Sequence, residues 1–461
     1  MGKPHVLVIP YPVQGHVIPL MELSLYLVKH GINVSFVNTK YNHDRIMSSF
    51  EEGSDIGSKL SLVWIADGLD SAENNAKKKP VSTGEVLKHM PGKVEELIDC
   101  LINSGSESNE KISCVLADQS IGWALDIAQK KGIQRAAFCP AAAAQLVHAF
   151  SIPKLIESGI IENNGTPLRK QTIQLSTTMP SLSTENLAWL NVGNLTTQKH
   201  IFELMMRNIK SMQLTEWLLC NSSYVLEQSA FTVSPNIIPI GPLLASNPLG
   251  NSVGNFWPQD LSIMNWLDQQ SSSSVIYVAF GSFRTMSPTQ FQELASGLEL
   301  SNRPFIWVVQ PDLIEGKNNN EYPKGFEDRV GDRGRMVGWV PQKKILSHSS
   351  IACFISHCGW NSTVESVSNG VPILCWPHFA DQFLNKSYVC DVWNVGMGFE
   401  KDERGVITSD EIRDKIERLL NDEELKERAN HLKEKVLSGI KQGGESSNNL
   451  DSFIKWIKMK N

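Results

Sequence analysis

The 461-residue chain has no C-x-x-C pair among its 8 cysteines, which stand at positions 100, 114, 139, 220, 353, 358, 375 and 390. Several lie inside apolar runs, which is typical of buried free thiols in a reducing compartment rather than of a disulfide framework. Cys353, His357 and Cys358 have no second ligand pair near them at metal spacing, so they do not predict a zinc site.

Long hydrophobic runs and a surplus of basic charge are also absent. The first apolar stretch, residues 5–9, is too short and too close to prolines for a signal peptide or a membrane span, and no later stretch is long enough. The formal net charge of −6 argues against a nucleic-acid partner, which favours a concentrated basic face. We therefore expect a cytoplasmic protein with no membrane span, and its length predicts two or three domains.

Short β-branched runs alternate with helix-period patterns in both halves of the chain. Strands are predicted at residues 5–9, 33–37, 60–65, 114–117, 135–138, 274–280, 304–309, 352–355 and 372–376. Helices are predicted at residues 17–29, 84–102, 121–130, 288–300, 361–368, 409–420 and 422–436. Such alternation indicates parallel sheets with helices on both faces, and therefore an α/β fold.

A stretch rich in Gly, Pro, Ser and Asn separates the two halves and predicts a linker at residues 244–261. We expect one parallel-sheet domain at residues 1–243 and a second at residues 262–446. Ligands of open parallel sheets bind outside the carboxyl ends of the strands. Two such edges facing across a cleft would hold two substrates against each other.

Residues 339–382 contain the strongest pattern in the chain. A predicted strand ends at His357, a glycine turn at Gly359 follows, and a helix is expected to begin near Asn361. The first amides of a helix carry partial positive charge, and Asn361 and Ser362 can cap the helix or donate to phosphate oxygens. The segment therefore suits a diphosphate without a metal, although Gly-Trp-Asn-Ser alone favours a plain capped helix.

A second pattern, Pro-x-x-Gly-His-x-x-Pro, places His16 after the first strand in what the sequence indicates is a loop. An imidazole titrates near neutrality and suits a general base, although a surface or capping histidine has the same local pattern. Asp118 follows the predicted strand 114–117 and can reach the neighbouring loop, or can simply cap a helix. No G-x-G-x-x-G follows the first strand, which argues against a nicotinamide oxidoreductase.

Residues 339–382 resemble, nearly residue for residue, the donor-binding box of plant UDP-dependent glycosyltransferases of small molecules, and the His16 pattern resembles the catalytic loop of the same family. The resemblance implies two facing Rossmann-like domains of the GT-B type, with a C-terminal helix at residues 447–461 packing back on the first domain. It also implies inverting transfer from UDP-glucose to a small molecule in secondary metabolism. We expect a monomer. We also expect that the enzyme needs no metal, since the chain contains no D-x-D triplet.

The resemblance also assigns roles to single residues. In the donor site, Trp339 would stack on the uracil, Val340 and Gln342 would read the base and ribose, and Glu365 would bind the ribose hydroxyls. The phosphates would be held by His357, Gly359, Asn361, Ser362 and Ser282. The hexose would be contacted by Trp360, Asp381 and Gln382. His16 would be the general base, oriented by Asp118.

Two features concern the sugar and the acceptor. A Gln at the end of the box resembles the glucose users of the family, whereas Pro140 or Ala141 stands where many relatives carry a hydroxyl near the sugar. The acceptor is expected to be a flavonoid, phenol, terpenoid or steroid in an apolar pocket. Its candidate contacts are Gln14, Gln119, Ala142, His148, Trp189, Phe283 and Phe379.

A non-catalytic nucleotide-sugar binding protein would keep the donor box without needing His16 or Asp118.

Overall fold

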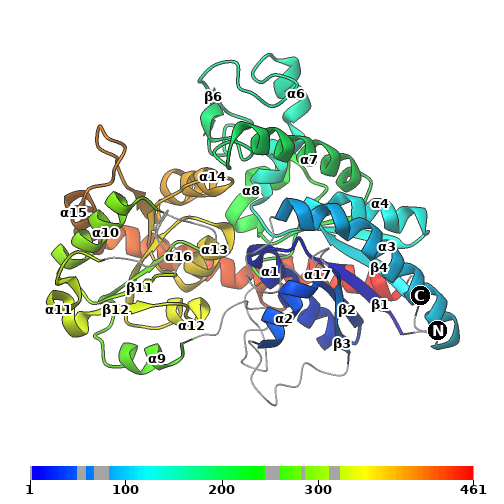
Figure 1. Ribbon diagram of the computed structural model, residues 1–461, viewed down its shortest axis with the longest axis horizontal. Coiled ribbons are helices and arrows are strands. Elements are labelled where there is room, and N and C mark those ends of the chain that lie inside the picture. The colour runs from blue at the N-terminus through cyan, green and yellow to red at the C-terminus, as the bar shows by residue number, and fades with distance from the viewer. Residues whose placement is uncertain are drawn as a thin grey trace, which may run out of the picture. The chain divides into compact units, whose positions relative to one another are not determined.

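The computed structural model describes residues 3–48, 59–66, 83–108, 111–243, 260–281, 286–310 and 322–459 (Figure 1). The chain forms two compact units. Unit 1 comprises Met1–Thr166, Leu195–Trp257 and Gly439–Asn461, and unit 2 comprises Pro167–Asn194 and Pro258–Ser438. Most of the predicted linker 244–261 lies outside the described residues.

Unit 1 is built on a seven-stranded parallel sheet with the strand order β3-β2-β1-β4-β5-β8-β9. Its strands are β1 (His5–Ile9), β2 (Asn33–Thr39), β3 (Leu60–Ile65), β4 (Ile112–Asp118), β5 (Gln134–Cys139), β8 (Trp217–Cys220) and β9 (Ile237–Pro239). The first five of these confirm the strands predicted in this half. Strand β4 extends one residue beyond the prediction at its carboxyl end, so that Asp118 is its last residue.

Helices cover both faces of this sheet. They are α1 (Gln14–Lys29), α2 (Lys40–Ser48), α3 (Thr83–Ser108), α4 (Gly122–Lys130), α5 (Ala143–Phe150), α6 (Ile152–Glu157), α7 (Leu195–Gln213), α8 (Tyr224–Val233) and α17 (Glu445–Met459), with a 3-10 turn at Gln119–Ile121. Val6 and Val8 of β1 point to the face where α1 and α17 supply Leu20 and Phe453, among others. Helices α3 and α4 contact β4.

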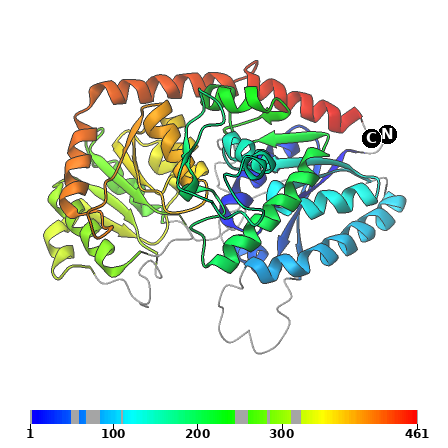
Figure 2. The ribbon, with the colours of Figure 1, turned by 90° about the horizontal axis from the view of Figure 1, so that it is seen from above.

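Helix α17 packs the end of the sequence against residues in and beside strands β8 and β9. Ser446 Oγ donates to the carbonyl of Gly241 at 2.7 Å, and Asn449 Nδ2 donates to the carbonyl of Pro239 at 2.8 Å. Phe453 is fully buried, with its ring centroid 5.4 Å from that of Trp217. Figure 2 shows α17, in red, on the unit that also contains the blue strand β1.

Unit 2 holds a six-stranded parallel sheet with the order β12-β11-β10-β13-β14-β15 and a separate two-stranded antiparallel pair. The sheet strands are β10 (Val275–Ala279), β11 (Phe305–Val308), β12 (Gly334–Val337), β13 (Ile351–Ser356), β14 (Ile373–Cys375) and β15 (Gly396–Gly398), and the pair is β6 (Thr172–Ile173) and β7 (Leu182–Ser183). The α/β fold with parallel sheets is thus confirmed in both units.

Residues of β10 alternate between the two faces of this sheet. Ile276 and Val278 pack with residues of α10 and α15, whereas Val275 and Tyr277 pack with residues of α9 and α12. The helices of this unit are α9 (Ser262–Leu267), α10 (Pro288–Leu300), α11 (Phe326–Val330), α12 (Gln342–Leu346), α13 (Trp360–Asn369), α14 (Gln382–Ser387), α15 (Ser409–Leu420) and α16 (Glu423–Ile440), which runs on into unit 1. The remaining turns are 3-10 at Thr184–Asn186 and Gly331–Arg333 and π-helical at Tyr388–Val392, named η4.

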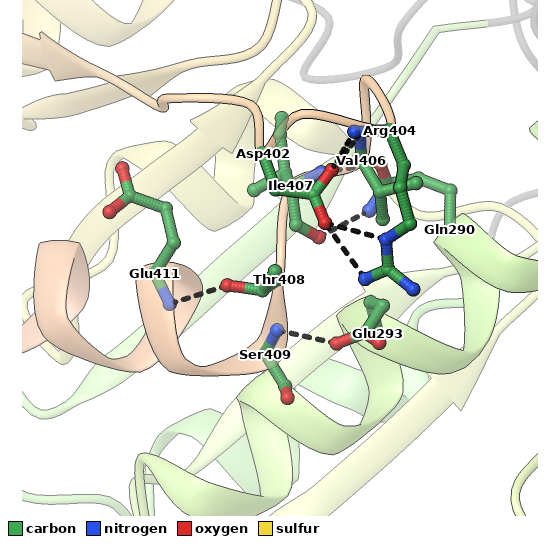
Figure 3. A network of polar contacts seen from close by, with 9 residues as sticks. All are labelled: Gln290, Glu293, Asp402, Arg404, Val406, Ile407, Thr408, Ser409 and Glu411. Atoms are coloured by element: carbon green, nitrogen blue, oxygen red, sulfur yellow. Dashed lines mark hydrogen bonds and ion pairs between the residues drawn. The ribbon is translucent and has the colours of Figure 1, made fainter.

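Polar contacts fasten the loop before α15 to helix α10 (Figure 3). Gln290 accepts from the backbone amide of Ile407 at 3.0 Å and donates to its carbonyl at 2.8 Å, so one side chain substitutes for a strand partner. Glu293 accepts from the amide of Ser409 at 2.6 Å. Asp402 accepts from the amides of Arg404 and Val406, and these contacts, led by the Val406 amide, lower the pKa of its carboxyl.

Each of the 8 cysteines is a free thiol. Among the described helices, none has the length and apolar character that crossing a bilayer requires.

Candidate active site

The strand order reverses once in each sheet, between β1 and β4 in unit 1 and between β10 and β13 in unit 2. At such a point the chain leaves two neighbouring strands in opposite directions, and ligands bind in the crevice that this opens. His16 and Asp118 lie at the first switch point, whereas Gly281, His357 and the start of α13 lie at the second. Each of the two polar patterns of the sequence therefore lies at a switch point, where this topology favours binding.

His16 lies in the first turn of α1, which begins at Gln14. The prediction that it stands in a loop before a helix beginning at residue 17 was wrong. The helix begins early because Val13 has extended backbone angles and its carbonyl accepts from the amides of His16 and Val17, both at 3.0 Å. A histidine in a first turn is held more rigidly than one in a loop.

Asp118 holds the imidazole of His16 through a short hydrogen bond. His16 Nδ1 lies 2.7 Å from Asp118 Oδ2, and the side chains are 25% and 0% exposed respectively. Asp118 Oδ1 accepts from the amide of Ser120 at 2.8 Å, which fixes the carboxylate. The carboxylate favours a proton on Nδ1, and Nε2 is then the ring nitrogen that can accept one. Both alternatives for Asp118 hold, since it also caps the 3-10 turn that follows β4.

Tyr11 is a neighbour that the sequence pattern did not indicate. Its ring centroid lies 5.0 Å from that of His16. Burial, reinforced by the charge of Asp118, raises the pKa of Tyr11 to about 12. The phenol is therefore neutral at pH 7, and it contributes packing rather than charge.

Gln342 joins two donor-box residues in unit 2. Its Nε2 donates to Ser362 Oγ at 3.0 Å and to Glu365 Oε2 at 2.8 Å. Tyr277 Oη donates to Gln342 Oε1 at 3.2 Å, which orients the amide. Tyr277 is buried within a strand and is indistinguishable from a core residue in the sequence. The structure thus assembles three predicted residues and adds a fourth that positions them.

The imidazole of His357 lies close to two glycines. A Cβ atom built on Gly359 would stand 2.4 Å from His357 Nε2, and one built on Gly281 would stand 2.8 Å from the same atom. Burial lowers the pKa of His357 to about 4, so the ring is neutral at pH 7 and can contribute a hydrogen bond but no charge. Ser282, which was predicted beside it, lies outside the described residues.

Helix α13 begins at Trp360, with Gly359 as its N-cap and no capping side chain among the described residues. The prediction of a helix that begins near Asn361 is confirmed to within one residue, and the N-cap position falls on Gly359 rather than on Asn361 or Ser362. Gly359 takes the extended N-cap conformation (φ −59°, ψ 143°) and has no side chain to occupy the first amides. The first amides of a helix carry partial positive charge, so this end of α13 suits an anion.

Two tryptophans of the donor box differ in their packing. Trp339 is half-buried, rests against a core cluster that includes Val340, and its carbonyl accepts from the amide of Asp260 at 3.0 Å. Trp360 is 4% exposed, with its ring centroid 6.3 Å from that of Trp393. The half-buried ring of Trp339 keeps surface for a ligand, whereas most of Trp360 belongs to the core.

Asp381 and Gln382 stand at the start of α14. Gln382 Oε1 accepts from the amides of His378 and Phe379 at 2.8 and 3.2 Å, so its Nε2 is the end that can donate to a ligand. Asn385 Nδ2 donates both to Asp381 Oδ2 at 2.8 Å and to the carbonyl of Cys358 at 2.9 Å. Asn385, which the sequence did not indicate, thereby ties the Asp381 turn to the loop after β13.

Several candidate acceptor contacts carry buried polar atoms without a partner among the described residues. They are Gln14 Oε1, Gln119 Oε1 and both ring nitrogens of His148. Burial lowers the pKa of His148 to about 4, so this ring is neutral at pH 7. Ala142 and Trp189 are buried, Phe379 is half-buried, and Phe283 lies outside the described residues.

The structure does not bring three or more His, Cys, Asp or Glu side chains of the described segments into a metal-binding group.

Known proteins of one family resemble this chain in sequence and in fold. A family model described as "UDP-glucoronosyl and UDP-glucosyl transferase" matches residues 199–458. UDP-glycosyltransferase 83A1 of Arabidopsis thaliana is 47% identical to the chain, covering 99% of it and 97% of the relative. Linamarin synthase 1 of Manihot esculenta is 31% identical, covering 98% and 97%. The structure of Phytolacca americana UGT2 complexed with UDP-2fluoro-glucose and pterostilbene is 25% identical, with a TM-score of 0.78 and coverage of 99% of both chains.

Proposed function

The chain belongs to the plant UDP-dependent glycosyltransferases of small molecules, and on that premise we propose that it transfers glucose from UDP-glucose to a hydroxyl of a small lipophilic acceptor, with inversion at the anomeric carbon. The observation that carries the proposal is the buried Asp118 carboxylate 2.7 Å from His16 Nδ1 at the switch point of unit 1. A protein that only binds nucleotide sugars needs no oriented base, whereas transfer to an alcohol requires one.

In this proposal His16 Nε2 removes the acceptor's proton while the acceptor oxygen attacks the anomeric carbon. Asp118 stabilises the imidazolium that forms, as an orienting carboxylate does in a catalytic triad. The glycosidic bond forms as the bond to UDP breaks, and the proton passes from His16 to solvent. The leaving diphosphate is stabilised by the first amides of α13, by His357 and by Ser282.

The donor site is proposed to lie at the second switch point. Trp339 stacks on the uracil, the backbone at Val340 reads the base, and Gln342 and Glu365 bind the ribose. Asn361 and Ser362 bind phosphate oxygens beside Gly359, and Trp360, Asp381 and Gln382 contact the glucose. The hydrogen bonds that join Gln342 to Ser362 and Glu365 support this placement, because a ligand spanning ribose and phosphate needs these groups together.

The acceptor is proposed to carry further hydrogen-bonding groups beside the reacting hydroxyl. The unpartnered oxygens of Gln14 and Gln119 and both nitrogens of His148 would each cost about 1–3 kcal/mol if a purely hydrocarbon ligand covered them. A flavonoid or another polyphenol satisfies such groups, and a steroid with a single hydroxyl does not. The pterostilbene named in the Phytolacca americana complex agrees with this class.

One assay tests the proposed function. The protein is incubated with UDP-glucose and acceptors drawn from the flavonoid, phenol, terpenoid and steroid classes, and both UDP release and glucoside formation are measured. We expect polyphenols to give the highest rates. Binding of UDP without release from UDP-glucose in the presence of any acceptor would identify a nucleotide-sugar binding protein instead.

The sugar preference is a separate expected result. We expect transfer from UDP-glucose to exceed transfer from UDP-galactose by roughly 10- to 100-fold, because an axial hydroxyl at the fourth carbon would leave the buried Nε2 donor of Gln382 unsatisfied. Initial rates at equal donor concentration measure this preference. UDP-xylose is a third donor of interest, since Pro140 supplies no hydroxyl for the sixth carbon. A higher rate with UDP-galactose would show that the sugar contacts are misassigned.

Gln382→Glu is the sharpest variant for this preference. It retains an oxygen for the amides of His378 and Phe379 but removes the donor, so the local turn persists while discrimination falls. Gln382→Ala removes both functions and serves as the comparison. Equal discrimination in the wild type and Gln382→Glu would assign the preference to another residue.

Metal independence is also expected. Transfer should persist in an excess of chelator, because hydrogen bonds from the amides of α13 and from the side chains around them stabilise the leaving diphosphate. The rate is measured with chelator and again after magnesium or manganese is restored in excess. Loss of transfer on chelation and recovery with either ion would contradict the proposed leaving-group chemistry.

A further inference from the structure

Three thiols gather behind the residues proposed to hold the sugar. Cys375 ends β14, Cys390 lies in the π-helical turn η4, and Cys358 follows β13. The sulfurs of Cys375 and Cys390 are 3.8 Å apart, and the thiol of Cys358 also lies within hydrogen-bonding reach of Cys375. Neither the donor chemistry nor the general base uses any of these sulfurs.

The three thiols differ in accessibility. Cys358 and Cys375 are buried, whereas Cys390 is partly exposed. The contact with Cys375, helped by Lys386 and Lys415, lowers the pKa of Cys390, while burial raises that of Cys375. A thiolate is the nucleophilic form of cysteine, so Cys390 is the sulfur that meets a dissolved oxidant first.

We propose that Cys375 and Cys390 form an intramolecular disulfide when the protein meets hydrogen peroxide, and that this bond slows sugar transfer. The Cys390 thiolate attacks one peroxide oxygen and becomes a sulfenic acid, and the other oxygen leaves as hydroxide and is protonated to water. The Cys375 thiol then attacks the sulfenic sulfur, the S–S bond forms, and a second water leaves. One peroxide accepts the two electrons, and a dithiol reductant reverses the change.

The disulfide would close the segment that carries the proposed sugar contacts. Residues 376–389 lie between the two sulfurs and include Asp381, Gln382 and Asn385. Bond formation must shorten the 3.8 Å separation to about 2.05 Å, which draws η4 toward the end of β14. This movement strains the Asn385 bridge between Asp381 and the Cys358 carbonyl. The effect on transfer rests on the proposed function, whereas the thiol chemistry does not.

Unit 1 contains a matched pair that should not react. Cys139 and Cys220 face each other in neighbouring strands β5 and β8, and each thiol donates to the carbonyl of Ala141 at 3.4 Å. Both residues are 0% exposed, and burial raises the pKa of Cys220. Close approach of two sulfurs is thus common to both pairs, and only the Cys375–Cys390 pair has a partly exposed member.

The experiment uses the full-length protein carrying Cys100→Ser, which removes an exposed thiol that could link two molecules. Peptide mapping after graded peroxide should find a Cys375–Cys390 link and reduced Cys139 and Cys220. Transfer from UDP-glucose should fall roughly 10- to 100-fold, the effect of an ångström-scale misplacement, and recover with dithiothreitol. UDP affinity should change less, because Trp339, Gln342 and Glu365 lie outside the closed segment. Cys390→Ser should transfer normally and resist peroxide.

Several results would overturn the proposal. These are a Cys358–Cys375 link in place of the expected one, oxidation of Cys390 without any link, and a link that leaves the transfer rate unchanged. Equal inactivation of Cys390→Ser would overturn it as well. Failure of the proposed function is distinguishable, because the fully reduced protein would then show no transfer before peroxide is added.

Discussion

His16→Ala is expected to lower turnover on an aliphatic alcohol by roughly 10²- to 10⁴-fold, the contribution of a positioned general base. Affinity for UDP should stay nearly unchanged, because the variant leaves unit 2 intact. Turnover is measured at saturating donor and acceptor, and UDP binding by calorimetry. The alcohol matters as a probe, since an acidic phenol ionises readily and needs little help from a base.

His30→Ala is the matched control, because it removes the histidine that ends the same helix and should leave turnover unchanged. Asp118→Asn should cost less than His16→Ala, since asparagine still offers an oxygen to the amide of Ser120 while losing the charge that stabilises the imidazolium. Turnover of His16→Ala on the alcohol at the wild-type rate would remove His16 from the mechanism.

The sequence predicted the sheets better than the site. Strands 5–9 and 60–65 and helices 288–300 and 409–420 match the structure residue for residue. Short apolar runs favour the strands, helix-period apolar spacing favours the helices, and Ser287 and Thr408 cap the two helices. Strand β15 was not predicted, since Gly-Met-Gly has no strand signal. It forms because β14 offers an edge and because a Cβ on Gly396 would come within 2.2 Å of the Ile373 carbonyl, so only glycine fits.

Polar residues within the site were harder to predict than their neighbourhood. The resemblance placed Gln342 and Gln382 in the donor site, but only the structure shows which end of each amide is occupied. Tyr277 and Asn385 were missed because a tyrosine in an apolar strand and an asparagine in a short helix have no functional pattern around them. Their importance depends on partners 65 and 27 residues away in sequence.

Gly359→Ala is expected to weaken UDP binding by roughly 10- to 100-fold, or about 1.4–2.7 kcal/mol. The added Cβ would stand 2.4 Å from Nε2 of His357, closer than unbonded atoms approach. Gly281 also approaches this ring, since a Cβ built there would stand 2.8 Å from the same Nε2. Either the imidazole or the first turn of α13 must move, and both are proposed to hold the diphosphate.

Gly359 is a clean position for this test, because its φ of −59° suits any residue and alanine adds a steric clash alone. Gly281 has φ +73°, so alanine there would add backbone strain to the clash. Gly439→Ala in α16 is the control, since its Cβ meets nothing within 4 Å and UDP binding should not change.

Removing the ring shows whether the clash is the cause of weaker binding. His357→Ala should weaken UDP binding by itself, because it deletes a proposed phosphate contact. With the imidazole gone, a Cβ at position 359 has no ring to displace, so Gly359→Ala should add little further loss in the double variant. Calorimetry on the four proteins gives this coupling directly, and residues that touch are expected to depart from additivity by 0.5–3 kcal/mol, roughly. Additive losses would mean that alanine acts on the helix amides rather than through His357, and unchanged UDP affinity in Gly359→Ala would place the diphosphate elsewhere.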